Sequence, residues 1–165
     1  MTANIKMRLI KKEEASLIHQ LAAKIWPPSF QQILSAEQIS YMINMMYAIP
    51  VLKKEIERGV AFYIFSYNET NIGYTAIEKK ENNSYKLHKI YLSQQLHGKG
   101  FGKYQLQCME NIVKGNGASF LYLNVNRQNK AVEFYKSQGY KIVEEVDNDI
   151  GNGYFMNDYV MKKEL

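Results

Sequence analysis

The feature that most constrains this chain is a run of glycines at every second position: Gly98, Gly100 and Gly102. The run lies between residues 85–92, which alternate like a strand, and residues 100–114, which have helical spacing. The start of a helix offers free backbone N–H groups and the positive end of the helix dipole, which together attract an anion. Because glycine has no Cβ, phosphate oxygens can approach such a loop closely. We therefore expect a strand–loop–helix unit with an anion site at its loop.

The glycine run does not match the sequence pattern of either of two common phosphate-binding loops. A P-loop needs its lysine to be followed by serine or threonine, whereas Lys103 is followed by Tyr104. A dinucleotide-binding loop has the spacing GxGxxG at the first strand–helix turn and an acidic residue about 20 residues later, and these conditions are not met. Lys99 and Lys103 add positive charge. A pyrophosphate site of another kind and a flexible loop without a ligand both stay open.

The rest of the chain divides by the period of its apolar residues. The first helix should end at Pro27–Pro28 and the third at Gly59. Helices are expected over residues 12–25, 35–46, 51–58, 100–114 and 129–137. Strands are expected over residues 5–9, 61–67, 72–78, 85–92, 120–125, 140–146 and 154–161. This order predicts an α/β domain with an antiparallel half, a parallel βαβ unit and a closing hairpin.

Composition predicts one globular domain over residues 1–165. The chain is 46% hydrophobic and 22% charged, which excludes disordered and disulfide-scaffold classes. No apolar run reaches the ~20 residues of a membrane span, and the start lacks the apolar stretch of a signal peptide, so no membrane association is expected. Cys108 is the single cysteine, which predicts a reducing compartment, the cytoplasm.

The distribution of charged residues indicates which classes of ligand the chain can bind. The net charge of +5 is spread along the chain without a basic cluster, so we expect no nucleic acid and favour a small anionic ligand. Three separated histidines and one cysteine have no metal-ligand spacing, so no metal is expected. A homodimer is left open by these patterns.

A second informative stretch, LNVNRQNKAVEFYKSQGY, covers residues 123–140. Asn129 lies where a predicted helix begins, so its side chain can cap that helix or bind a ligand amide. Phe134 is expected in the core. Tyr135 differs from it, because a tyrosine hydroxyl usually needs a polar partner.

These two stretches together resemble the GNAT superfamily of N-acetyltransferases. The first is similar to its acetyl-CoA signature, (Gln/Arg)-x-x-Gly-x-(Gly/Ala), at Gln95, Gly98 and Gly100. The second is similar to the family pattern Asn-x-x-Ala-x-x-Phe/Tyr-Tyr-x-x-x-Gly-Phe/Tyr at Asn129, Ala131 (one place early), Phe134, Tyr135, Gly139 and Tyr140. The resemblance covers residues 60–162. Within the family, the chain resembles bacterial small-molecule members and, more loosely, the polyamine acetyltransferases.

The resemblance implies a mixed, mostly antiparallel sheet of about seven strands, flanked by helices, with a central parallel βαβ unit that binds acetyl-CoA. Pantetheine would enter between the strand before the loop and the strand after the helix. Backbone groups of residues 90–92 would hold its amides and the acetyl group, and loop N–H groups of residues 96–102 would hold the pyrophosphate. The implied acetyl-CoA residues are Ile90, Tyr91, Leu92, Gln95, Leu96, His97, Gly98, Lys99, Gly100, Phe101, Gly102, Lys103 and Asn129.

The resemblance also implies that Tyr135 protonates the departing thiolate. The family often has a glutamate on the strand before the loop, but strict alternation here places His88 on the face of Ile90 and Leu92, with no carboxylate. His88 is our candidate for this place, and the arylalkylamine acetyltransferases resemble the chain in having a histidine there. A pKa near 6.5 suits proton acceptance at neutral pH. The alternative is a partly buried histidine with a satisfied hydrogen bond.

The function expected is transfer of acetyl from acetyl-CoA to the primary amine of a small molecule by direct attack. Cys108 lies on an apolar helix face without an evident base, so a covalent acyl-enzyme is not expected. Trp26, Phe30 and Tyr47 lie in the segment that usually walls the acceptor site in this family, where they would bind substrate or belong to the core. The alternatives are an N-terminal acetyltransferase of proteins or peptides and a non-catalytic CoA-binding regulator.

Overall fold

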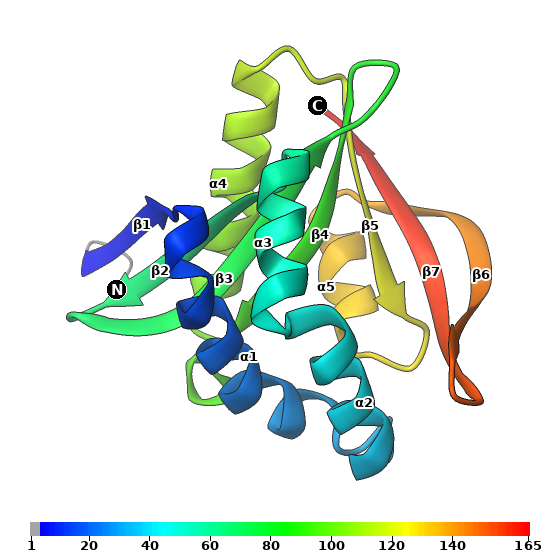
Figure 1. The fold of residues 1–165 in the computed structure, drawn as a ribbon. Coiled ribbons are helices and arrows are strands. Elements are labelled where there is room, and N and C mark those ends of the chain that lie inside the picture. Colours follow the sequence, from blue (N-terminus) through cyan, green and yellow to red (C-terminus); the bar gives the residue numbers. More distant parts are fainter. Residues whose placement is uncertain (1–3) are drawn as a thin grey trace.

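A computed structural model describes residues 4–165 of the protein. Within these residues one sheet has seven strands in the order β1-β2-β3-β4-β5-β7-β6 (Figure 1). The strands are β1 (Ile5–Leu9), β2 (Ala61–Tyr67), β3 (Thr70–Lys79), β4 (Ser84–Leu92), β5 (Phe120–Asn126), β6 (Lys141–Gly151) and β7 (Tyr154–Glu164). The helices are α1 (Ala15–Phe30), α2 (Ala36–Tyr47), α3 (Ile49–Arg58), α4 (Phe101–Gly115) and α5 (Ala131–Ser137), with short 3₁₀ turns at Lys12–Glu14 and Gln94–Leu96. The predicted mixed, mostly antiparallel sheet is confirmed.

Helices cover both faces of the sheet (Figure 1). On one, called here the α1–α3 face, helices α1, α2 and α3 pack over a core that includes Trp26 and Phe62. On the other, the α4–α5 face, α4 and α5 pack over a core that includes Phe101 and Leu121. None of the helices described is both long and apolar enough to cross a membrane. Each face of the sheet therefore has its own hydrophobic core.

The parallel pair β4 and β5 is short. The strands pair over Ser84–Leu87 and Phe120–Leu123, and no further pair is found in the described residues, although β4 continues to Leu92 and β5 to Asn126. β5 instead pairs with β7 along its whole length. The two strands therefore separate toward the glycine loop (Figure 1), and their facing edges have backbone groups without a partner in the sheet.

A β-bulge at His88 changes the direction of the side chains at the end of β4. The pairing of β3 with β4 skips His88 between Leu87 and Lys89. The carboxylate that contacts His88, Glu78, pairs with Arg58 of α3. Lys89 contacts Glu55 of the same helix. Ile90 and Leu92 instead pack with the α4–α5 core. The expectation that Ile90 and Leu92 share a face with His88 is therefore wrong, because one extra residue inverts the alternation.

Helix α1 continues through Pro27 and Pro28, although the sequence predicted that it ends there. A proline removes the hydrogen bond to the carbonyl four residues earlier. Those carbonyls belong to Ala23 and Lys24, which are exposed, so water can bind them. Phe30, at the end of the helix, is 6% exposed, and its burial holds the last turn against the core.

The start of α2 and the end of α3 follow local sequence signals. Ser35 caps α2 by accepting the N–H of Gln38 at 3.1 Å, and Gly59 ends α3 with a left-handed φ of 112°. The closing hairpin is longer than predicted, because β6 and β7 have 11 residues each. The second strand of this hairpin, β7, is the one that lies beside β5.

Gly73 of β3 allows a close approach of β4. A Cβ here would lie 2.4 Å from the carbonyl oxygen of Tyr91 and 2.8 Å from the side-chain nitrogen of Gln105. We predict that Gly73→Ala destabilises the protein by about 1–3 kcal/mol, the usual cost of an extra methyl group in a packed interior. Urea unfolding measures this, with Gly115→Ala as control, because a Cβ at Gly115 meets nothing within 4 Å. Equal unfolding free energies for Gly73→Ala and the parent would contradict the packing argument.

Candidate active site

The glycine loop has the geometry of an anion-binding turn. Gly98 and Gly100 have φ of 76° and 88°, left-handed values that glycine adopts at little cost. Gly100 immediately precedes α4 and accepts the N–H of Tyr104, so the N–H groups of the first three helical residues remain for another acceptor. A Cβ at Gly98, Gly100 or Gly102 would meet no atom within 4 Å. The loop therefore faces open space.

One buried ring anchors this loop, while its polar and charged residues are exposed. Phe101, the first residue of α4, is 1% exposed and belongs to the α4–α5 core. Gln95, Lys99 and Lys103 are exposed. An open glycine turn, free helix N–H groups and two lysines fit a pyrophosphate group. The structure thus brings the predicted loop residues together at the end of β4.

Two side chains hold the backbone at the end of β4. The Gln105 amide donates to the carbonyl oxygen of Tyr91 at 3.1 Å, and the Nε2 of His97 lies 3.1 Å from the carbonyl oxygen of Leu92. Gln105 is 1% exposed, and its Oε1 has no hydrogen-bond partner within residues 4–165. Sequence reasoning missed Gln105, although a glutamine among the apolar positions of a helix is a signal. Of the residues predicted to bind pantetheine, Ile90 has no side-chain donor on its carbonyl in the structure described.

Asn129 lies two residues before α5, and Tyr135 lies within that helix. The Oδ1 of Asn129 accepts the N–H of Ala131, the first helical residue, at 2.9 Å. Among the described residues its amide nitrogen has no hydrogen-bond acceptor, so it keeps donors for a ligand. Tyr135 is 7% exposed, and its ring centroid lies 5.9 Å from that of Tyr140. Burial raises the pKa of Tyr135. Its phenol is therefore protonated at neutral pH and can donate a proton.

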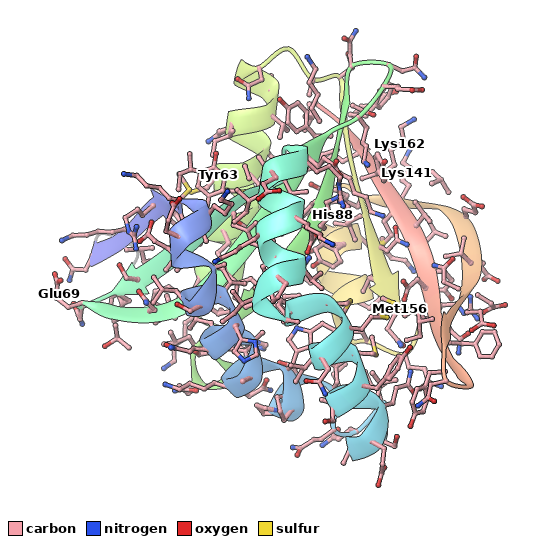
Figure 2. The ribbon with its side chains drawn as sticks, in the orientation of Figure 1. Tyr63, Glu69, His88, Lys141, Met156 and Lys162 are labelled. Carbon is pink, nitrogen blue, oxygen red and sulfur yellow. The ribbon has the colours of Figure 1, made fainter. Side chains whose placement is uncertain are left out.

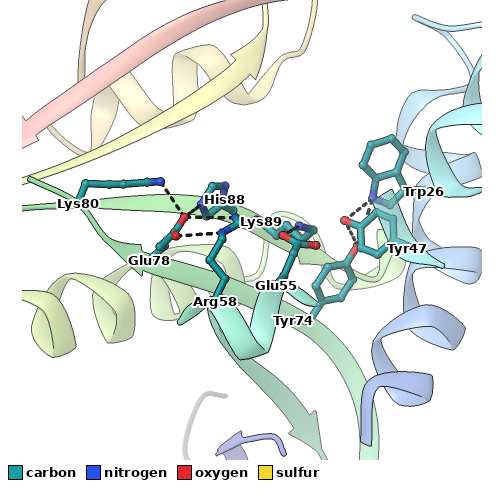
Figure 3. Close-up of polar contacts among 9 residues, drawn as sticks. All are labelled: Trp26, Tyr47, Glu55, Arg58, Tyr74, Glu78, Lys80, His88 and Lys89. Atoms are coloured by element: carbon teal, nitrogen blue, oxygen red, sulfur yellow. Dashed lines mark hydrogen bonds and ion pairs between the residues drawn. The ribbon is translucent and has the colours of Figure 1, made fainter. Parts of the chain in front are cut away.

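His88 lies in a cluster of charged groups on the α1–α3 face (Figure 3). Its Nε2 is 2.7 Å from the Oε1 of Glu78, whose carboxylate also contacts Arg58 at 3.2 Å and Lys80 at 2.9 Å. Burial opposes the ionisation of Glu78, but these three hydrogen-bond partners lower its pKa to about 2. Because an ionised carboxylate only accepts hydrogen bonds, Nε2 of His88 carries a proton and Nδ1 is left as the acceptor.

The pKa of His88 is lowered to about 4, which changes the role it can have. Burial is the largest cause, and the charges of Lys86 and Lys89 add to it, while Glu78 opposes it. The ordinary pKa of about 6.5 assumed from the sequence does not hold in the fold, because the sequence does not reveal burial. At neutral pH His88 is therefore uncharged and hydrogen-bonded, and it can relay a proton without storing it.

A buried ion pair fixes α3 beside His88 (Figure 3). The Nζ of Lys89 lies 3.2 Å from Glu55, and the two side chains are 9% and 13% exposed. The same ammonium faces the rings of Tyr47 and Phe62, at 5.5 and 5.3 Å from their centroids. Removing one partner would leave a buried charge alone, so the pair holds α3 in place on β4.

The aromatic residues expected near the acceptor are buried. Trp26, Phe30 and Tyr47 are 2%, 6% and 0% exposed. The indole N–H of Trp26 lies 3.1 Å from the hydroxyls of both Tyr47 and Tyr74, and Tyr74 donates to Tyr47 at 2.8 Å (Figure 3). Their burial places them in the α1–α3 core, one of the two locations expected from the sequence. A contact with the acceptor stays a prediction.

Asp158 of β7 is a buried acid that sequence reasoning missed. It is 3% exposed, and burial raises the pKa of its carboxyl group against the effect of its neighbour Asn124. Burial also raises the pKa of Tyr91, and Tyr135 and Asp158 lie close enough to add to this shift. Groups from β4, α5 and β7 therefore come together where β4 and β5 separate. Nothing in the alternation of β7 distinguishes this acid beforehand.

Comparison with known proteins assigns the chain to a family. The family described as "Acetyltransferase (GNAT) domain" matches residues 31–163. The chain belongs to the GNAT acetyltransferases, which confirms the resemblance predicted from its two motifs. It is an acetyltransferase by its family domain. A comparison with curated protein sequences gives no match.

Solved structures share the fold over nearly the whole chain. The PaiA N-acetyltransferase of Thermoplasma acidophilum, in complex with coenzyme A, is 26% identical, with a TM-score of 0.81 over 98% of this chain and 99% of that one. The ribosomal-protein-S18-alanine N-acetyltransferase of Escherichia coli is 11% identical, with a TM-score of 0.73 over 97% and 93%. A chimera of the Vibrio cholerae spermidine N-acetyltransferase SpeG and hSSAT is 16% identical, with a TM-score of 0.70 over 98% and 96%.

Gly102 tests whether acetyl-CoA binds at the glycine loop. Unlike Gly98 and Gly100 it has no left-handed φ, and a Cβ there meets nothing within 4 Å, so a side chain fits without strain. We predict that Gly102→Val keeps the stability of the fold and weakens acetyl-CoA binding at least about tenfold, because its methyl groups obstruct the pyrophosphate. Calorimetric titration measures the affinity, and thermal unfolding is the control. An unchanged affinity would place the pyrophosphate elsewhere.

His88 makes the stability of the fold depend on pH. Its pKa is about 4 in the folded protein and about 6.5 in an unfolded chain, so between these values only the unfolded chain binds the proton. The contribution of His88 is complete above pH ~6.5 and falls by about 2 kcal/mol down to pH 5. We predict that His88→Gln removes this part of the decrease, measured by urea unfolding at pH 7 and pH 5. Parallel decreases in parent and variant would show that burial does not disfavour the charged imidazole.

Proposed function

We propose that this N-acetyltransferase moves the acetyl group to the primary amine of a small molecule by direct attack. The observation that carries the proposal is the gap between β4 and β5, with the glycine loop at its end and the neutral phenol of Tyr135 nearby. Burial raises the pKa of Cys108, the single cysteine, so little thiolate is present to form an acyl-enzyme. The single thiol also supports the cytoplasm as the compartment.

The choice of a small amine rests on the general resemblance of the sequence and on one fold relative. The sequence resembles bacterial small-molecule members of the family, and the SpeG chimera is described as a spermidine N-acetyltransferase. The enzyme that acts on ribosomal protein S18 shares the fold, so N-terminal acetylation of a protein is the alternative that an experiment must separate.

The glycine loop would hold the pyrophosphate of acetyl-CoA through the N–H groups at the start of α4. The backbone of Ile90, Tyr91 and Leu92 would bind the pantetheine amides and the acetyl carbonyl along the open edge of β4. Gln105 and His97 contact the carbonyl oxygens of Tyr91 and Leu92, which holds the backbone at this end of β4 in place. Asn129 would contact the thioester arm with its free amide donors.

Two neutral side chains account for the proton transfers. The amine nitrogen attacks the thioester carbonyl, the C–S bond breaks, and the thiolate takes the proton of the Tyr135 hydroxyl, which solvent then restores. The nitrogen gives up its own proton before or during the attack. Nδ1 of His88 can accept that proton transiently and pass it to water, since a pKa of about 4 prevents its retention.

Tyr135→Phe tests the proposed acid. We predict that kcat falls by about 10²–10⁴, the usual scale of general acid–base catalysis, because the thiolate then leaves without a proton donor. The affinity for acetyl-CoA should stay near that of the parent. Tyr85→Phe, which removes a hydroxyl bonded to Asn116, is the matched control and should keep kcat. An unchanged kcat in Tyr135→Phe would mean that the thiolate leaves through water.

A panel of acceptors tests the reaction itself. The purified protein is incubated with acetyl-CoA and alkylamines, polyamines, arylalkylamines, amino acids or short peptides with free N-termini, and CoA release is followed. We expect turnover with a small primary amine and little with peptides. Turnover of peptides alone would establish the N-terminal alternative. Acetyl-CoA binding without turnover of any acceptor would favour a CoA-binding regulator.

A further inference from the structure

Some acidic side chains on the α1–α3 face form an ion pair with a lysine or arginine, and one does not. Glu55 pairs with Lys89, and the carboxylate of Glu78 has two cationic partners besides His88. Asp158 is 3% exposed, yet in the part of the chain described it has no lysine or arginine within ion-pair distance. It is therefore a buried acid whose counter-charges, from Lys86 and Arg127, act from a distance and not by contact.

Alternation in β7 places Asp158 on the α1–α3 face. Tyr159 and Met161 belong to the α4–α5 core, whereas Met156 packs against the α1–α3 core. Figure 2 views the molecule from this face, with His88 and Met156 labelled. Asp158 lies opposite Asn126, in the part of β5 that no longer pairs with β4. The carboxylate is therefore beside the gap, on the side of the sheet that also carries His88.

The cationic side chains that act on Asp158, Arg127 and Lys86, contact other groups. Arg127 donates to the backbone carbonyl oxygens of Val146 and Asp158, at 3.1 and 3.3 Å, and pairs with the exposed carboxylate of Asp147. Lys86 lies over the ring of Tyr122, 5.9 Å from its centroid. Both charges favour the ionised form of Asp158 from a distance, against the effect of burial. Neither of them neutralises it by contact.

A buried carboxylate without a cation in contact is costly even with the hydrogen bond of Asn124, and a bound cation lowers that cost. Groups of this kind occur at functional sites, where a ligand completes them. Besides burial, Asp158 and Tyr135 both contribute to the raised pKa of Tyr91, so both lie near the end of β4 where the gap opens. The neutral imidazole of His88 offers no charge of its own to attract it.

We propose that Asp158 binds the ammonium group of the acceptor and so selects alkylamines, which are cations at neutral pH; this rests on the proposed function. The ammonium N–H groups donate to the carboxylate, which positions the nitrogen at the gap. One proton then leaves the nitrogen for water, by way of His88, and the neutral amine attacks. The proton of Tyr135 goes to the thiolate, so the step balances.

The test compares Asp158→Asn, Asp158→Glu and Asp147→Asn, the last being an exposed acid that pairs with Arg127. With the best alkylamine of the panel, Asp158→Asn should raise the KM for the amine at least about tenfold and leave the KM for acetyl-CoA unchanged. Asp158→Glu should restore part of the affinity. Asp147→Asn should behave as the parent. An unchanged KM for the amine, or an equal rise in both KM values, would overturn the proposal.

A binding measurement separates this proposal from the reaction. Calorimetry follows butylammonium chloride added to the CoA-saturated protein at constant ionic strength. Binding by the parent and loss of binding in Asp158→Asn would support the proposal even if no amine in the panel were acetylated, the result that would reject the proposed function. Equal binding by both proteins, or no binding by the parent, would overturn the role of Asp158.

Discussion

The short parallel contact between β4 and β5 is the constraint on which the rest of the site depends. Four residue pairs join the strands, and β5 then follows β7. On the other side β4 stays with β3, where Gly73 lets it approach closely and Gln105 holds its backbone. Each strand is thus fixed by its outer neighbour, so the gap is a permanent part of the fold. Its unpaired backbone groups suit an extended ligand with amides of its own.

The charged groups on the α1–α3 face have two kinds of role: some stabilise the fold, and others belong to the proposed site. Glu55 and Lys89 compensate each other and fasten α3 to the sheet. Glu78 gathers several donors and orients His88, while burial keeps that imidazole neutral. With the neutral phenol of Tyr135 across the gap, both proposed proton carriers are uncharged at rest. Among the described acids of this region, Asp158 is then the one without a lysine or arginine in contact.

Much of this fold follows from patterns that act locally. The glycine loop, the cap at Ser35 and the strand–helix order were all predictable, since each depends on neighbouring residues. The bulge at His88 was not, because alternation alone does not say where a register slips. The course of α1 past Pro27 depends on which carbonyls face water, a tertiary property. Gln105 and Asp158 became visible once packing showed which polar groups are buried.

The bulge at His88 has a consequence for how such an enzyme can diversify. The residues on either side of it, Leu87 and Lys89, already alternate between the two cores as consecutive residues of an ordinary strand would. His88 is thus an extra residue, and its identity is not tied to strand pairing. A substitution or even a deletion there can change the charged cluster around Glu78 while the hydrophobic layers keep their places. His88 can therefore vary independently of the residues that maintain the sheet and its two cores.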